Sequence, residues 1–247
     1  DGVPRLPRGT SPSTHILKID DQRFPGLVSA EAAALRLARG LGLGDLDPQL
    51  HQIEGVDCLI VARYDRLRAA DGTIGRVHQE DSCQALGVMP DAHRGRGKYE
   101  SSGGPTFAQI ASLLRRYSAD PGDELDRLVR MIAFTMIIGN ADGHGKNLSL
   151  LYPAPGMPTL APLYDTVPTV LWPRLRTTAA MSVAGETEFI RIGLDAITRE
   201  AEGWGMPGER ARSLAVDVVE RALRAASGLG HDQVGELVTG RATQMLG

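Results

Sequence analysis

The chain has 247 residues, enough for one domain or two small lobes, and its 42% hydrophobic and 23% charged residues are typical of a globular protein. Its net charge of −3 argues against a general nucleic-acid binder and against adhesion to anionic membranes, because both need a basic surface. The longest apolar run is too short to cross a bilayer and no signal peptide is visible, so we expect a cytoplasmic protein.

Residues 1–70 predict a small lobe that contains β-structure. Residues 1–13 are rich in Pro, Gly, Ser and Arg, which indicates a loop or the tail of a hairpin. Strands are expected where β-branched and aliphatic residues cluster, and a helix where Ala and Leu do. The expected elements are a strand over Thr14–Ile19, a helix over Ser29–Arg39, a loop over Leu41–Leu46 and strands over Leu50–Glu54 and Asp57–Arg63. Ser29 is the expected N-cap, with Glu31 in the first helical turn.

Lys18 lies inside the first expected strand, and Glu31 lies in the helix that follows. A protein kinase uses such a lysine at the ATP phosphates and such a glutamate as its ion partner. An exposed lysine on an edge strand and a glutamate that complements the helix dipole would give the same pattern. The pattern alone leaves both interpretations open.

Two cysteines, Cys58 and Cys83, lie in apolar surroundings, which favours core thiols, and a disulfide between them is also compatible with the sequence. No Cys-x-x-Cys or His-x-x-x-His spacing occurs, which argues against a structural zinc site.

A turn over Asp71–Gly75 marks the expected boundary with a mainly helical lobe over residues 71–247. Amphipathic periodicity and breakers define its elements, whereas Ser182–Phe189 has no clear pattern. The expected elements are a segment over Val77–Gly87 with Glu80 and Asp81 at a helix N-terminus, a linker or mobile loop over Val88–Gly104, helices over Pro105–Tyr117, Asp123–Ile138, Ile197–Gly203, Pro207–Ser227 and Asp232–Leu246, and a loop over Thr166–Arg174.

A dense group of polar residues, Asn140–Asn147, follows the buried helix directly. The apolar segments Leu148–Tyr152 and Thr159–Leu163 come next and predict a hairpin, with a Pro/Gly turn over Pro153–Pro158. The polar loop is therefore held between rigid core elements, as catalytic groups usually are.

Asn147 falls five residues after Asp142, the interval between the base and the metal-binding Asn of the protein-kinase catalytic loop. Asp165 follows the expected hairpin and can return to face Asp142, which would place a carboxylate to orient the attacking hydroxyl and an Asn–Asp pair to hold Mg²⁺. A turn rich in Asn, Asp and Gly without chemistry is the alternative for the spacing alone. The position of Asp165 favours phosphoryl transfer.

Gly139-Asn-Ala-Asp-Gly-His-Gly-Lys-Asn147 with Leu160-Ala-Pro-Leu-Tyr-Asp165 resembles the HipA family of serine/threonine kinases, the toxins of bacterial toxin–antitoxin pairs. Further matching segments are Pro12–Lys18, Cys58–Arg66, His78–Asp81 and Lys98–Pro105. The resemblance covers essentially all of this chain but only the last half to two-thirds of the family's usual length. It implies an α+β, two-lobed protein-kinase-like fold, with a β-containing N-lobe remnant and a mainly helical C-lobe.

The resemblance implies that Asp142 is the catalytic base and that Asn147 and Asp165 hold Mg²⁺. It places the backbone of Ala62 and Tyr64 at the adenine and Asp65 near the ribose. The ATP-binding set that it implies is Lys18, Glu31, Ala62, Arg63, Tyr64, Asp65, His144, Gly145, Lys146, Asn147, Tyr164 and Asp165.

No glycine-rich phosphate loop precedes Lys18, and no G-x-x-x-x-G-K-[ST] motif occurs. HipA proteins carry that loop and a further N-terminal subdomain upstream of the matched segment. Because the sequence begins at Asp1 rather than Met, we expect it to start inside a longer protein.

The family implies a protein substrate, such as an aminoacyl-tRNA synthetase, and a HipB-like DNA-binding antitoxin as partner, with no direct nucleic-acid or membrane contact. Two alternatives remain open: a catalytically inactive module that binds an antitoxin or partner, and a small-molecule phosphotransferase. A metal-dependent hydrolase built on Asp142, His144 and Asp165 is disfavoured, because the loop offers too few ligands.

Overall fold

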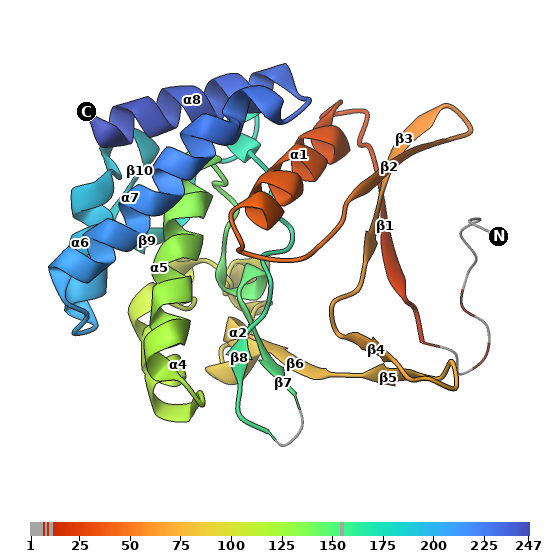
Figure 1. The fold of residues 1–247 in the computed structure, drawn as a ribbon, viewed down its shortest axis with the longest axis horizontal. Helices are drawn as coiled ribbons and strands as arrows, with labels where there is room; N and C mark the ends of the chain where they lie inside the picture. The colour runs from red at the N-terminus through yellow and green to blue at the C-terminus, as the bar shows by residue number, and fades with distance from the viewer. Residues whose placement is uncertain (1–6, 8, 10–11, 154–155) are drawn as a thin grey trace.

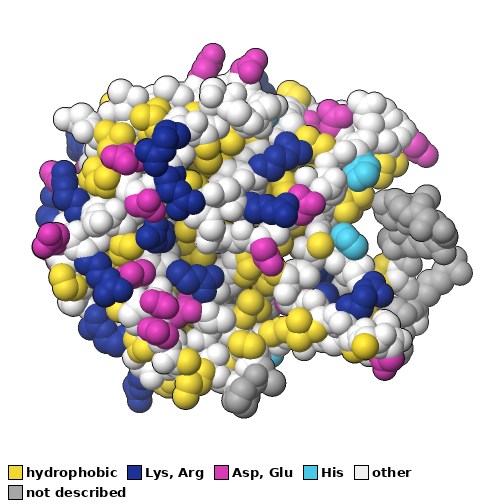
Figure 2. Space-filling view, viewed as in Figure 1, with side chains coloured by type: hydrophobic (Ala, Val, Ile, Leu, Met, Phe, Trp, Pro, Cys, Tyr) yellow, Lys and Arg dark blue, Asp and Glu magenta, His cyan; other side chains and the backbone are white. Residues whose placement is uncertain are grey.

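The computed structural model describes residues 7, 9, 12–153 and 156–247 and shows a small β-rich lobe beside a larger helical lobe (Figure 1). The expected α+β architecture is confirmed. The loop or hairpin tail expected over residues 1–13 lies mostly outside the described residues. Acidic and basic side chains are interspersed over the face in Figure 2, in keeping with the small net charge.

The smaller lobe is built on an antiparallel sheet with the order β1-β3-β2, formed by β1 (His15–Ile19), β2 (Gln49–Ile53) and β3 (Val56–Ala62). Glu54 and Gly55 join β2 to β3 with φ angles of 51° and 81°, as a tight hairpin turn requires. One face of the sheet packs against helix α1 (Leu27–Gly40).

Helix α1 begins earlier than expected, and the prediction of Ser29 as its N-cap is wrong. Gly26, with φ 82°, is the N-cap, and the Ser29 hydroxyl instead donates to the Gly26 carbonyl. The Asp20 carboxylate accepts the backbone N–H groups of Gly26 and Val28, so an acid six residues upstream satisfies the helix start. Glu31 consequently lies beyond the first turn, not in it.

Helix α1 also packs into the core of the larger lobe. Its alanines have almost no exposed surface, and they divide between the two cores: Ala32 belongs to the small one, and Ala30, Ala33, Ala34 and Ala38 belong to the large one. Small side chains on opposite sides of the helix let both lobes approach its backbone closely. The helix is therefore a shared element of the two lobes.

Five helices form most of the larger lobe, each close to a predicted helix. They are α4 (Phe107–Tyr117), α5 (Pro121–Ile137), α6 (Leu194–Gly203), α7 (Gly208–Ala225) and α8 (Asp232–Leu246). Helix α5 is the buried centre, as its apolar sequence predicts, and Asp120 caps it by accepting the N–H of Asp123. Within the described residues, no helix is both long and apolar enough to cross a membrane.

A second sheet, with the strand order β6-β7-β8, adjoins the polar loop, which leads into β7. Its strands are β6 (His78–Asp81), β7 (Ser149–Tyr152) and β8 (Thr159–Leu160), and β7 and β8 form the predicted hairpin; the turn expected over Pro153–Pro158 lies partly outside the described residues. The expectation that Glu80 starts a helix is wrong, because residues 78–81 pair with a strand about 70 residues away. Asp81 does cap a short helix, α2 (Ser82–Ala85), by accepting the N–H of Gln84.

The remaining elements are short. They are the ribbon β4 (Arg66–Arg68) and β5 (Ile74–Arg76), α3 (Ala92–Gly95), the ribbon β9 (Thr178–Val183) and β10 (Glu186–Glu188), and the 3₁₀ turns η1 (Glu100–Ser102), η2 (Gly145–Asn147), η3 (Thr169–Leu171), η4 (Phe189–Arg191) and η5 (Ala226–Gly228). The stretch Val88–Gly104, expected to be a linker or mobile loop, contains α3 and η1. The Glu100 carboxylate attaches it to β9 by accepting both the N–H and the hydroxyl of Ser182. Cys58 and Cys83 are buried free thiols, as the core interpretation predicts.

Candidate active site

The polar loop is fixed to the molecule at Gly139, directly after α5. Gly139 has φ 63°, and a Cβ there would lie 2.3 Å from Cγ2 of Val170. Two residues later, the Ala141 N–H donates to the Thr169 hydroxyl at 2.7 Å. The turn η3 therefore holds the start of the loop, and only glycine fits at its first position.

Lys18 joins the smaller lobe to the larger one. Its ammonium lies 2.6 Å from Glu31 and 2.6 Å from Asp165, which confirms the expected contact with Glu31. Burial alone would lower the pKa of Lys18, but the two carboxylates outweigh it and raise that pKa, so the lysine is charged at neutral pH. The Glu31 side chain is only 1% exposed, and burial raises its pKa although the ion pair with Lys18 opposes that shift; its Oε2 is buried without a hydrogen-bond partner among the described residues.

Asp165 follows the hairpin and turns back toward the loop with φ 53°, a left-handed conformation that Asp tolerates better than most residues. Its second oxygen accepts the Asn147 amide at 2.7 Å. Burial opposes ionisation of Asp165, yet Lys18 and Asn147 lower its pKa below the usual value. An ionised carboxylate and an amide thus lie side by side, as the sequence predicts for this pair.

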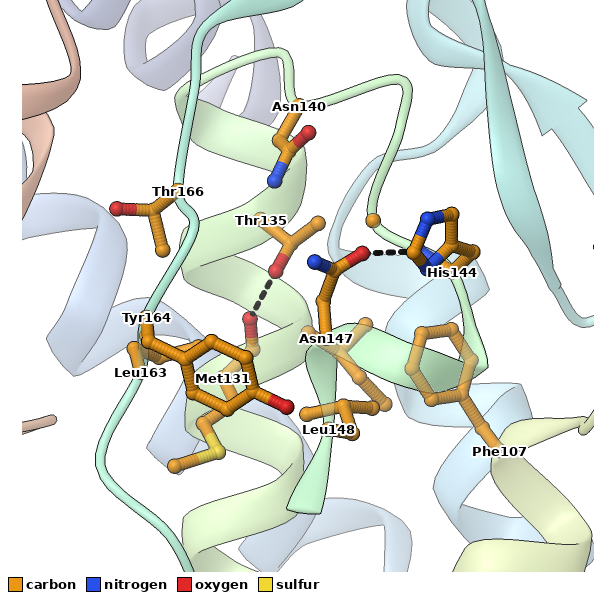
Figure 3. A pocket seen from close by; sticks show the side chains of 12 residues that line it. Phe107, Met131, Thr135, Asn140, His144, Asn147, Leu148, Leu163, Tyr164 and Thr166 are labelled. Atoms are coloured by element: carbon orange, nitrogen blue, oxygen red, sulfur yellow. Dashed lines mark hydrogen bonds between the residues drawn. The ribbon is translucent and has the colours of Figure 1, made fainter. Parts of the chain in front are cut away.

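Asp142 belongs to the same cluster. One of its oxygens lies 3.9 Å from Nε2 of His144. The His144 backbone N–H donates to the Asn147 side chain at 3.1 Å (Figure 3). Burial lowers the pKa of His144 despite the nearby Asp142, so the imidazole is neutral at pH 7. The loop therefore brings Asp142, His144 and Asn147 together, and Asn147 connects them to Asp165.

A small cavity lies under the loop, between Asn147 and α5 (Figure 3). About 20 Å³ of it is open to the centre of a water molecule, which is room for one water and far too little for a nucleotide. The cavity is therefore a small gap in the packing beneath the loop and is not a nucleotide site. A nucleotide would have to bind over the exposed side of the cluster, where the Asp142 and Asp165 side chains are each 49% exposed.

The hinge after β3 combines backbone and aromatic groups. The Arg63 N–H donates to the Thr14 carbonyl. The pairing of β3 with β2 ends two residues before Ala62, so β2 does not cover the backbone of Ala62. The Tyr64 ring packs against the Tyr164 ring with centroids 5.6 Å apart, and the Tyr164 hydroxyl donates to the Lys146 carbonyl at 2.6 Å. This contact ties the hinge to the polar loop.

Two residues of the implied ATP-binding set have other partners. Asp65 is buried and paired with Arg63 and Arg66 at 2.7 and 2.6 Å, and Lys146 reaches the helix-capping Asp81 at 2.8 Å. Neither side chain joins the Lys18–Asp165 cluster in this structure. Nothing tests their expected roles at the ribose and the phosphates, which stay predictions.

Gly145 lies where the backbone of another segment comes close. Its N–H donates to the Lys98 carbonyl at 3.2 Å, and a Cβ on it would lie 2.5 Å from Cγ of Pro105. The segment from Lys98 to Pro105 is therefore packed directly on the polar loop.

Tyr99 is the residue of this site that sequence reasoning missed. Its hydroxyl donates to Oδ1 of Asp142 at 2.6 Å, and its ring meets the His144 ring edge-on, with centroids 5.3 Å apart. Its segment is polar, rich in glycine and without periodicity, which indicated a mobile loop. The Lys-Tyr-Glu motif was the only signal that marked it.

The residue types of the cluster fit Mg²⁺, since Asp165 has a carboxylate and Asn147 an amide oxygen, the hard oxygen ligands that Mg²⁺ prefers. In this structure the Asn147 oxygen accepts the His144 N–H and its NH2 group faces Asp165, so the amide would have to turn to present that oxygen to a metal ion. Across the described residues, no three His, Cys, Asp or Glu side chains form a metal cage. A magnesium ion held by one or two protein ligands together with phosphates and waters suits this arrangement, whereas a metal enclosed by protein alone does not.

Comparisons with known proteins show which proteins this chain resembles. At the level of sequence, the chain is 40% identical to Y4mE of Sinorhizobium fredii, whose name proposes a kinase, over 98% of this chain and 59% of that protein. It is 30% identical to the serine/threonine-protein kinase toxin HipA of Shewanella oneidensis, over 87% of this chain and 50% of HipA. The chain thus spans about half to three fifths of the length of these curated relatives.

Among solved structures, the complex of Shewanella oneidensis HipA, HipB and operator DNA contains a chain that matches 97% of this one and 58% of its own length, with a TM-score of 0.81 and 26% identity. The Helicobacter pylori proinflammatory kinase CtkA matches 94% of this chain and 88% of its own, with a TM-score of 0.52 and 12% identity, which is a likeness of fold alone. The family described as HipA-like C-terminal domain matches residues 3–226. The chain therefore belongs to the HipA-like C-terminal domain family.

Proposed function

We propose that this chain carries the catalytic machinery of an ATP-dependent serine/threonine protein kinase of the HipA type. One observation carries the proposal: Lys18 from the sheet, Glu31 from α1 and Asp165 from beyond the hairpin meet in one ion cluster, and Asn147 of the loop that carries Asp142 donates to Asp165. This is the set of groups that phosphoryl transfer between two lobes requires.

Each side chain has a distinct task in this proposal. Lys18, held by Glu31, binds the ATP phosphates, and the hinge backbone at Ala62 and Tyr64 faces the adenine. Asp142 accepts a hydrogen bond from the substrate hydroxyl and aims it at the γ-phosphate. Asp165 and Asn147 would hold Mg²⁺, which neutralises the charge that develops on the phosphates.

Phosphate transfer from radiolabelled ATP, measured on the full-length protein, tests the proposal. Asp142→Asn and Asp165→Asn are each expected to lower transfer by at least about a hundredfold, because each removes one indispensable charge. Asp195→Asn, which changes an exposed acid on α6, is the matched control and should transfer phosphate as the wild type does. Transfer that survives the Asp142→Asn/Asp165→Asn double substitution would remove the assignment.

We propose further that the acceptor is a serine or threonine of a translation component, such as an aminoacyl-tRNA synthetase. The support is the resemblance to the HipA toxins and the 30% identity with the Shewanella oneidensis kinase toxin. Phosphopeptide analysis of host proteins after a pulse of expression, compared with the Asp142→Asn variant, identifies the acceptor. Transfer to a metabolite but to no protein would favour a small-molecule phosphotransferase.

A HipB-like DNA-binding antitoxin is the partner we propose. The similar Shewanella oneidensis chain is part of a complex with HipB and operator DNA. Co-expression with a helix-turn-helix protein encoded beside this gene should yield a co-purifying complex that shifts its operator DNA. A kinase that purifies alone under those conditions would argue against this partner.

A further inference from the structure

The segment that carries Tyr99 is anchored on both sides. Before Tyr99, the Lys98 carbonyl accepts the Gly145 N–H; after it, Glu100 holds Ser182 of β9. The Tyr99 carbonyl accepts the Gly104 N–H at 2.9 Å, and a Cβ on Gly104 would lie 2.6 Å from the Tyr99 backbone. These contacts give Tyr99 a fixed backbone rather than that of a mobile loop.

Two cations hold the Tyr99 ring. The Arg176 guanidinium lies 5.0 Å from the ring centroid and the Lys98 ammonium 5.2 Å from it, both within the range of cation–π attraction. The His144 ring meets the same ring edge-on. The side chain therefore has a defined orientation, and its hydroxyl points to Asp142.

The hydrogen bond from Tyr99 gives the two oxygens of Asp142 different surroundings. Oδ1 accepts the Tyr99 hydroxyl, whereas Oδ2 lies 3.9 Å from His144 and has no hydrogen-bond donor among the described residues. Burial and the bond to Asp142 raise the pKa of Tyr99 to about 12, so the phenol keeps its proton at neutral pH and acts only as donor. A hydrogen bond to one oxygen fixes the orientation of the carboxylate group and leaves its other oxygen free to accept another hydrogen bond.

We propose that Tyr99 is a positioning residue for phosphoryl transfer: it holds Oδ1 of Asp142 so that Oδ2 faces the acceptor hydroxyl. This inference rests on the proposed function and assigns a task to a residue outside the Asp142–Asn147–Asp165 set. Because Tyr99 contacts Asp142 and His144 and not the Lys18–Asp165 cluster, loss of its hydroxyl should slow the transfer step without weakening ATP binding.

Tyr99→Phe in the full-length protein is the test, since it keeps the ring with its contacts to Arg176, Lys98 and His144 and deletes one oxygen. We expect kcat to fall about tenfold, the loss of one hydrogen bond to a charged group, with the KM for ATP unchanged. Lys98 and Arg176 over the ring and His144 beside Asp142 are unchanged in this variant.

Tyr152→Phe is the matched control. Tyr152 also donates to a carboxylate, that of Glu80 at 2.5 Å, and burial and this bond raise its pKa to about 12 as well, but it lies on β7 away from Asp142. Its variant should keep the wild-type kcat and the wild-type KM for ATP, and both variants should unfold near the wild-type temperature.

Each other outcome overturns the proposal. A Tyr99→Phe enzyme with wild-type kcat would show that the hydrogen bond is irrelevant to transfer, and one with a raised kcat would show that Tyr99 inhibits Asp142. A raised KM for ATP would show that Tyr99 supports nucleotide binding instead. A fall in kcat matched by Tyr152→Phe would reduce the effect to general destabilisation. If the wild type transfers phosphate, any of these sinks this inference alone; if it transfers none, the proposed function fails first.

Discussion

The ion pair between Lys18 and Glu31 makes the stability of the protein depend on the lysine that we propose binds the ATP phosphates. Glu31 is buried and depends on the lysine for compensation, whereas Lys18 is 31% exposed and can also reach a ligand. Removing the cation leaves a buried carboxylate alone, which is costly, and removing both charges avoids that cost.

Lys18→Met should therefore lower the free energy of unfolding by about 2 kcal/mol, less than for a fully buried pair because the lysine is partly in water. Adding Glu31→Gln should restore most of that stability, while phosphate transfer stays lost in both variants. Urea denaturation and the transfer assay measure the two effects. A single variant as stable as the wild type would show that the pair contributes little.

The ion pairs of Asp65 predict how the stability of the protein changes with pH. Burial opposes its ionisation, but Arg63 and Arg66 outweigh burial and lower its pKa below the usual 3.8. A lowered folded-state pKa means that the stabilisation is fully present above pH 3.8 and is lost as pH falls through the lower folded value. Asp65→Asn should thus cost about 3 kcal/mol at pH 7 and progressively less below pH 3.8.

Urea denaturation at a series of pH values measures this difference. Asp47→Asn, which changes an exposed ion pair with Arg39, is the control and should cost less than about 1 kcal/mol at any pH. A cost for Asp65→Asn that does not depend on pH would show that packing, not charge, is what the substitution removes.

At the scale of elements, the position of the polar loop depends on how α5 ends. Gly139 turns the chain in a left-handed conformation against Val170, and η3 accepts the next part of the loop. Sequence spacing alone places Asp142 and Asn147 correctly relative to each other. Their position relative to Asp165 depends on this turn and on the hairpin.

Gly139→Ala should destabilise the protein by about 1–3 kcal/mol, because it combines an unfavourable φ with an overlap against Val170. Transfer activity should fall more than stability explains, since the loop has to shift. Adding Val170→Ala removes the overlap but not the strained φ, so stability should recover only in part. Thermal denaturation and kcat, measured on the same preparations, check both effects.

The elements that the sequence predicts well are those with a local signal. Helices α4 to α8 follow apolar periodicity, and the β7–β8 hairpin follows its breakers. The failures depend on distant partners: Asp20 replaces Ser29 at the start of α1, and residues 78–81 become a strand because β7 lies beside them. Tyr99 belongs with these, since only the folded chain brings it to Asp142.

At the scale of the whole molecule, helix α1 couples the two lobes. It contributes Val28 and Leu35 to the smaller core and Leu37 to the larger one, and the Leu163 N–H donates to the Leu43 carbonyl just past its end. The boundary expected near residue 70 stays a prediction. The two lobes are packed together through α1.

Leu37→Ala should lower the free energy of unfolding by about 2–5 kcal/mol, because Leu37 is only 2% exposed and its loss leaves a cavity. Both lobes should lose stability together and unfold in one transition. Hydrogen exchange of β3 amides reports the small lobe, and the fluorescence of Trp172 and Trp204 reports the large one. A β3 that exchanges independently of the fluorescence change would show that the lobes are not coupled through α1.

The alanines of α1 also limit how the sequence can evolve. Ala33 and Ala34 have no exposed surface, so a larger side chain at either position needs an equal loss of volume in the core that faces it. Descendants of this gene should therefore keep small residues at these two positions, or change them only in step with a neighbour across the interface.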